Sequence, residues 1–88
     1  MRILGVLNSA KRKIKAFVKK YPELESKLEK TVSGLLKDPF QDRFDTHKLT
    51  GRLKHLYAAS ITYEHRLIFF FDDKCIYIVN IGSHDEVY

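Results

Sequence analysis

The sequence predicts a small α+β protein in which an N-terminal strand and a two-helix hairpin pack on a twisted antiparallel sheet. Three observations lead to this fold class. Apolar residues recur at helical spacing in the first half of the chain, apolar runs of strand length fill the second half, and a short polar turn joins two of those runs. With 88 residues, the chain is expected to form one domain over residues 1–88.

The first half of the chain predicts a strand followed by two helices. Residues 2–7 (RILGVL) form a short apolar run, and Asn8 or Ser9 is suited to accept a bond from the first free helix amides. Pro22 either ends the first helix or opens the second one. Two helices joined this tightly predict an antiparallel hairpin. The apolar positions that mark them are Ile14, Phe17, Val18 and Tyr21, then Leu24, Leu28, Val32, Leu35 and Leu36, before a stop at Asp38-Pro39.

The second half predicts three strands, at residues 52–61, 65–71 and 75–81. Asp72-Asp73-Lys74 has the composition of a tight hairpin turn between the last two strands. The run from Leu67 to Phe71 is apolar on both faces. We therefore expect it to be the central strand, with the helices over one side of the sheet.

Composition restricts the class of protein. Hydrophobic residues make up 44% of the chain, which is enough to bury a core. A single cysteine excludes an intrachain disulfide framework and fits a reducing cytosol, so a cytoplasmic location is expected. No apolar run approaches the roughly 18 residues of a membrane span, and the N-terminal apolar stretch is too short for a signal peptide. No membrane partner is expected.

The chain is basic, with 16 Lys and Arg against 11 Asp and Glu and a net charge of +5. A basic surface favours polyanions such as nucleic acids, although many small domains are mildly basic. The distribution of charge is more informative than its sum, because six cations fall within ten residues of the first helix. They form either a solvated helix face or a contact with RNA. The six are Lys11, Arg12, Lys13, Lys15, Lys19 and Lys20.

His84 is the strongest single candidate for chemistry. It follows Gly82-Ser83 at the end of the last predicted strand, so its side chain is expected to be accessible. Near neutral pH an imidazole can donate or accept a proton, although a histidine in a tail can also be an ordinary surface residue. A hairpin through residues 72–74 can bring Arg66 beside His84. Together with the phenol of Tyr88, these groups are suited to attack a phosphodiester without a metal.

Several further residues are weaker candidates for the same site. His47 is either a second proton-transfer group or a loop cap. Glu64 either orients an imidazole, acts as a base, or is an exposed glutamate at a turn with no function. Tyr88 either stacks on an RNA base or packs back on the sheet. A predicted basic rim, which would contact the nucleic-acid backbone, comprises Lys48, Arg52 and Lys54.

A metal site is not expected. No two of the four histidines have the i, i+4 spacing of a helical zinc site, and there is no second cysteine. We therefore predict neither a metal nor another cofactor. The four histidines are His47, His55, His65 and His84.

Three segments resemble the RelE/ParE toxin superfamily, and most closely its YafQ-like branch. HKLTGRLK (47–54) and GSHDEVY (82–88) are similar to segments of YafQ-like toxins, while EHRLIFF (64–70) is similar to the matching strand of YoeB-like and RelE-like toxins. The resemblance implies a RelE-like fold. By position it implies a catalytic His84, a phosphate-binding Arg66, a base-stacking Tyr88 and a matching His47, with Glu64 where the YafQ-like branch has an aspartate.

The resemblance implies a toxin of a type II toxin–antitoxin pair that cuts mRNA in the ribosomal A site by metal-free acid–base transesterification. The implied partners are a cognate acidic antitoxin, mRNA and ribosomal RNA, with operator DNA bound only through the antitoxin. Two alternatives stay open. One is a ParE-like inhibitor of DNA gyrase, which would not need the GSH…Y ending. The other is a catalytically decayed member that only binds antitoxin or RNA, which is favoured by Ala58 and Ser60 where YafQ-like chains carry an aspartate and a histidine.

Overall fold

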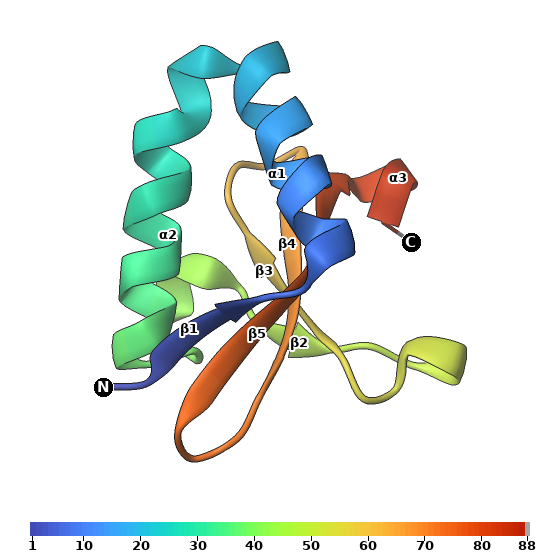
Figure 1. Cartoon of the computed structure of the whole chain (residues 1–88). Helices are drawn as coiled ribbons and strands as arrows, with labels where there is room; N and C mark the ends of the chain where they lie inside the picture. The colour runs from blue at the N-terminus through green and yellow to red at the C-terminus, as the bar shows by residue number, and fades with distance from the viewer. Residues whose placement is uncertain (88) are drawn as a thin grey trace.

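The computed structural model describes residues 1–87 and shows a five-stranded sheet with two long helices over one face (Figure 1). Tyr88 lies outside the described residues. Three short 3₁₀ helices, η1 to η3, connect the main elements. In chain order the elements are β1 (Ile3–Val6), α1 (Asn8–Lys20), η1 (Pro22–Leu24), α2 (Glu25–Lys37), η2 (Asp42–Phe44), β2 (His47–Lys48), η3 (Gly51–Leu53), β3 (Tyr57–Ser60), β4 (His65–Phe71), β5 (Cys75–Ser83) and α3 (His84–Val87).

The strands lie in the order β1-β5-β4-β3-β2, so the predicted central position of β4 is confirmed. The pairs β3–β4 and β4–β5 are antiparallel, as expected. The pair β2–β3 is also antiparallel, although the sequence pattern predicts no strand at His47–Lys48. The sheet is nevertheless mixed, because β1 runs parallel to β5, with Ile3 opposite Cys75 and Val6 opposite Ile78. The chain between these two strands contains both long helices and the other three strands. It is therefore long enough for a parallel crossover, whereas a two-residue hairpin can join only antiparallel strands.

The predicted helical hairpin is confirmed, and α2 ends at Lys37, just before Asp38-Pro39 (Figure 1). Pro22 opens η1 between the two helices. The predicted helix cap at Asn8 or Ser9 is wrong. The capping position is Leu7, whose apolar side chain cannot accept a capping bond and whose backbone N–H still donates to Ile78 O of the sheet at 3.2 Å. The chain therefore enters α1 directly from the strand, and Asn8 is already helical.

The strand predicted at residues 52–61 is shorter than expected. Only Tyr57–Ser60 is extended, and Gly51–Leu53 forms η3 instead. Gly51 has a φ of 66°, a left-handed conformation that glycine adopts without strain. Leu49 N–H then donates to Leu56 O at 2.9 Å and closes the intervening loop.

The predicted turn at Asp72-Asp73-Lys74 is confirmed. The Asp72 backbone N–H donates to Cys75 O at 3.0 Å, and the Asp72 carboxylate accepts bonds from the backbone N–H groups of Lys74 and Cys75 at 2.8 and 2.7 Å. These backbone bonds lower the pKa of Asp72 from its ordinary value of 3.8. The turn fixes how the last two strands meet.

Hydrophobic residues are buried on both faces of the sheet. The larger cluster lies under α1 and α2 and includes Phe17, Leu35, Leu67 and Phe69. A smaller cluster uses the alternate residues of the strands, on the opposite face of the sheet. The two long helices do not cover this face, and we call it the open face. Burial of each large aliphatic side chain contributes about 1.5–3 kcal/mol, so this cluster holds the η3 segment and α3 on the open face of the sheet. Its members are Leu49, Ala58, Ile68 and Val87, with Leu53, Leu56 and Val79 packed against them.

Within residues 1–87, no helix combines the length and the apolar character that crossing a membrane requires.

Gly34 in α2 gives a test of the packing between this helix and η2. A Cβ at this position would collide with the ring of Phe44 and lie 2.6 Å from Arg43 Nη2. Alanine normally stabilises a helix interior by about 1 kcal/mol relative to glycine. Here we expect Gly34→Ala to destabilise the protein by about 1–3 kcal/mol through overpacking. Thermal unfolding measures this, with the exposed neighbour Ser33→Ala as control, which should stay within about 0.5 kcal/mol of wild type. A Gly34→Ala protein more stable than wild type would contradict the described packing.

Candidate active site

The register of the central strands places Arg66 on the open face of the sheet. Arg66 lies opposite Ser60 of β3 and opposite Gly82 of β5. Side chains alternate between faces along a strand, so Arg66 shares a face with Ile68 of the smaller cluster. Leu67, between them, points into the larger cluster under the helices.

The Arg66 guanidinium holds the loop between β3 and β4. Its Nη1 donates to the carbonyl oxygens of Thr62 and Tyr63, both at 2.8 Å, and to that of His65 at 3.2 Å. All three bonds use one nitrogen of a group that has five N–H donors in a planar fork. The same residue can therefore fix its own loop and still present donors to an anion.

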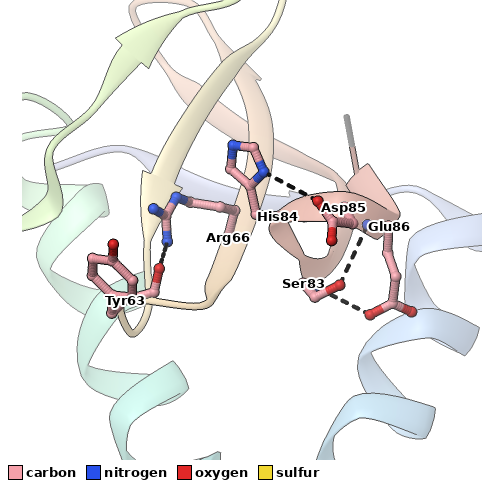
Figure 2. A network of polar contacts seen from close by, with 6 residues as sticks. All are labelled: Tyr63, Arg66, Ser83, His84, Asp85 and Glu86. Carbon is pink, nitrogen blue, oxygen red and sulfur yellow. Dashed lines mark hydrogen bonds and ion pairs between the residues drawn. The ribbon is translucent and has the colours of Figure 1, made fainter.

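His84 begins α3 and is tied to the same loop. Its backbone N–H donates to Glu64 O at 2.9 Å. Its side chain is 59% exposed, and Nδ1 lies 3.6 Å from the Asp85 carboxylate, which pairs with the imidazolium form. Figure 2 shows the imidazole on the side of α3 that faces Arg66. The predicted proximity of His84 and Arg66 is confirmed by their shared pocket, described below.

A reciprocal capping box fixes the start of α3 (Figure 2). The Glu86 carboxylate accepts a bond from Ser83 N–H at 3.0 Å, and the Ser83 hydroxyl accepts one from Glu86 N–H at 3.3 Å. The bond from the Ser83 backbone is the main cause of the lowered pKa of Glu86, with the Ser83 hydroxyl next. Val87 adds a hydrophobic anchor, since it is buried in the smaller cluster. His84 is thus held by its backbone bond to Glu64 and by the capping box that surrounds it in the chain.

These groups surround one open pocket of about 480 Å³. It brings together three of the predicted catalytic residues, Arg66, His84 and Glu64. The pocket therefore combines a fixed cation, an imidazole and carboxylates, which are the groups that proton transfer next to a bound anion requires. Its complete lining is Tyr63, Glu64, Arg66, Ser83, His84 and Asp85.

His47 does not line this pocket. It lies in β2 opposite Ala58, two strands from β4, which corresponds to about 10 Å at the usual strand spacing. Its Nδ1 is 3.1 Å from Asp45 O. Pairing with Ala58 places His47 on the same face as Arg66. His47 instead lines a second hollow of about 420 Å³ together with Lys48.

The three residues of the predicted basic rim are all exposed. Lys48 is in β2, Arg52 in η3, and Lys54 directly follows η3. The leucines of this segment pack in the smaller cluster, so the rim borders the same open face as the pocket. Tyr88, the predicted base-stacking residue, lies outside the described residues.

Several residues of the site were not singled out from the sequence. The Ser83-x-x-Glu86 spacing is a capping-box signature that sequence reasoning could have found. Tyr63 and Asp85 carry no such signal. His65 is 7% exposed and packs edge-on against Phe17 and Tyr21, with its Nδ1 2.8 Å from Thr62 Oγ1. It is a core histidine that anchors the loop.

Within residues 1–87, no three His, Cys, Asp or Glu side chains lie close enough together to hold a metal ion.

Comparison with known proteins identifies relatives of the whole chain. Residues 4–88 match the model of a family described as the YafQ bacterial toxin of the type II toxin–antitoxin system. No curated protein sequence matches the chain.

Solved structures share the fold over almost their full length. Escherichia coli YafQ is 18% identical with a TM-score of 0.85, covering 100% of this chain and 99% of that one. A chain of the E. coli DinJ–YafQ toxin–antitoxin complex is 19% identical with a TM-score of 0.82, and the match covers 99% of this chain and 97% of that one. A metal-bound Helicobacter pylori toxin is 23% identical with a TM-score of 0.83, and the match covers 100% of both chains. At these identities the likeness shows the fold, which confirms the predicted RelE-like class.

The capping box gives a prediction about pH. The pKa of Glu86 in the folded protein is below its ordinary value of 4.5, so the stabilisation of α3 is complete above 4.5 and is lost as pH falls through the lowered value. We expect the amide protection factor of Ser83, measured by NMR hydrogen exchange, to fall in that acidic range.

Glu86→Gln serves as the matched control, because its amide oxygen can accept the same bond but does not titrate over this range. Its Ser83 protection should therefore be less sensitive to acid. Equal acid sensitivity in wild type and Glu86→Gln would show that another group controls the start of α3.

Proposed function

Since the chain belongs to the YafQ family of bacterial type II toxin–antitoxin toxins, we propose that it is an endoribonuclease that cuts mRNA in the ribosomal A site. The observation that carries the proposal is the single pocket lined by Arg66, His84 and Glu64. The net charge of +5 and the exposed rim of Lys48, Arg52 and Lys54 support a polyanionic substrate. These cations would contact the RNA backbone without reading its sequence.

The proposed reaction is a transesterification within the RNA. The 2′-oxygen attacks the adjacent phosphorus, a new P–O2′ bond forms, and the bond to the 5′-oxygen of the next nucleotide breaks. One group must remove the 2′-hydroxyl proton and another must protonate the leaving oxygen. We assign the first role to the Glu64 carboxylate and the second to the His84 imidazolium, because both line the pocket.

Arg66 has the electrostatic role in this scheme. A guanidinium beside the phosphate offsets the charge that grows on its oxygens as the transition state forms. The backbone bonds of Arg66 to Thr62 and Tyr63 hold the group in place before substrate binds, so little reorganisation is needed. His47 lies farther along the same face, where a second proton-transfer role would require the RNA to bridge both hollows. Tyr88 is proposed to hold an mRNA base.

The proposed inhibitor is an acidic antitoxin that folds as it covers the basic face. The related E. coli YafQ forms a complex with the antitoxin DinJ. Binding to operator DNA would occur only through the antitoxin. The proposed site of action is the cytoplasm, where mRNA and ribosomes meet.

A second candidate is a member of the fold that binds RNA or antitoxin without cleaving. It is favoured by Ala58 and Ser60, which lie on the open face beside Ile68 and Arg66 and carry no acid or base. Single-turnover cleavage on programmed ribosomes separates the two candidates, since a binding protein would protect the A-site codon without cutting it.

His84→Ala tests the proton-transfer role. Expression of the wild-type chain should arrest growth, and the variant should relieve the arrest, with cleavage slowed by about 100-fold or more. His55→Ala is the matched control, because His55 is an exposed histidine outside the pocket and should leave toxicity unchanged. Circular dichroism should show both variants folded. A folded His84→Ala variant with undiminished toxicity would remove His84 from the mechanism.

The ends of the products test the chemistry. Cleavage should leave a 2′,3′-cyclic phosphate on one fragment and a 5′-hydroxyl on the other, because the nucleophile is the 2′-oxygen. It should persist in a chelator specific for transition metals, with magnesium supplied to keep the ribosomes assembled. A 5′-phosphate, or activity that depends on added zinc or manganese, would overturn the mechanism. Efficient cutting of free RNA would leave the chemistry standing but disprove the A-site requirement.

A further inference from the structure

Tyr63 is the most exposed large aromatic residue within residues 1–87, at 92%. Phe40, the other exposed aromatic, is 52% exposed and packs against Tyr57 and Phe71 with ring centroids 5.7 and 5.6 Å away. Among the described residues, no such ring contact is found for Tyr63. An aromatic side chain carries 150–250 Å² of surface that is favourable to bury. The Tyr63 ring is therefore presented for a contact that residues 1–87 do not supply.

The backbone that carries Tyr63 is held firmly. Arg66 Nη1 donates to Tyr63 O at 2.8 Å. The Thr62 hydroxyl accepts bonds from the N–H groups of Glu64 and His65 at 3.2 and 3.1 Å. His65 is buried against α1. A ring on a fixed turn loses less conformational entropy on binding than one on a mobile loop.

The position of the ring relates it to the proposed chemistry. Tyr63 lines the same pocket as Arg66 and His84. In Figure 2 the Arg66 side chain lies between the Tyr63 ring on one side and the His84 imidazole on the other. A phosphate at Arg66 would therefore bring a neighbouring nucleotide over the tyrosine ring. Every base has a π-face that can stack on an aromatic side chain.

We propose that Tyr63 binds a nucleobase of single-stranded RNA by stacking, next to the phosphate held by Arg66. This inference rests on the proposed function. It makes the loop between β3 and β4 a substrate-binding element, in addition to the base contact proposed for Tyr88. The basic charge of the chain and the shared pocket favour RNA over a protein partner for this ring.

Binding of a labelled short single-stranded RNA tests the stack directly, in the His84→Ala background so that the RNA stays intact. Tyr63→Ala and Tyr63→Leu should weaken binding by about 5- to 150-fold, the range of one base–aromatic stack. Tyr63→Phe should bind like the parent, because the ring and not the hydroxyl makes the contact. Ile3→Ala removes exposed apolar surface outside the pocket and should have no effect. Unchanged melting temperatures would confirm that the variants fold.

Abasic RNA makes the test independent of any general loss of affinity. One base is removed at each position in turn. When the stacked base is missing, Tyr63→Ala should not weaken RNA binding further. When any other base is missing, Tyr63→Ala should weaken binding as much as it does with intact RNA. An equal cost of Tyr63→Ala at every position would overturn the stacking of Tyr63 on a single base.

Cleavage on programmed ribosomes identifies the source of the base. If Tyr63 stacks on mRNA, Tyr63→Ala changes the preference among A-site codons. If it stacks on ribosomal RNA, Tyr63→Ala weakens ribosome binding and leaves codon preference unchanged.

Full cleavage and full RNA binding by Tyr63→Ala would overturn this inference alone and leave the ring to a protein partner. A wild-type protein that neither binds nor cuts RNA would instead overturn the proposed function.

Discussion

The antiparallel pairing of β4 with β5 positions all the groups of the pocket. His65 is opposite Ser83 and Arg66 is opposite Gly82, so the loop before β4 and the helix after β5 emerge at the same end of the sheet. A shift of one residue would turn Arg66 toward the helices and expose Leu67 on the open face. Burial of β4 on both faces prevents that shift, since each face accepts only its own set of side chains. The hydrophobic core therefore determines where the cation lies.

Polar contacts then fix the two segments that this pairing brings together, the loop before β4 and the helix α3. On one side, Arg66 binds the carbonyls of its own loop, and on the other, Ser83 and Glu86 cap α3. The two sides are joined where His84 N–H donates to Glu64 O. Gly82 permits α3 to fold close to the strand, because a Cβ there would lie 3.2 Å from Glu86 Cβ. The pocket is therefore supported by backbone groups on both sides, which limits how far Arg66 and His84 can separate.

Much of this arrangement could be predicted from the sequence, because local patterns encode it. The apolar run of β4, the turn at residues 72–74 and the approach of Arg66 to the end of β5 follow from alternation and hairpin geometry. The pairing of Arg66 with Gly82 also depends on a register shift between Ile68 and Phe69, which the sequence does not signal. Features that depend on distant contacts could not be read in this way. The parallel pairing of β1, the conversion of residues 51–53 into η3, and the distance of His47 from the pocket depend on which surfaces meet in the folded chain. No period or spacing in the sequence records those contacts.

The parallel pairing of β1 with β5 joins two strands that the ribosome makes at very different times. Ile3 is translated more than seventy residues before its partner Cys75. Until then β1 has an unsatisfied edge, and α1 lacks the strand on which it packs most extensively. The same late strand leads directly into His84. A nascent chain therefore cannot assemble the pocket before β5 has been synthesised, so the sheet and the pocket are completed together.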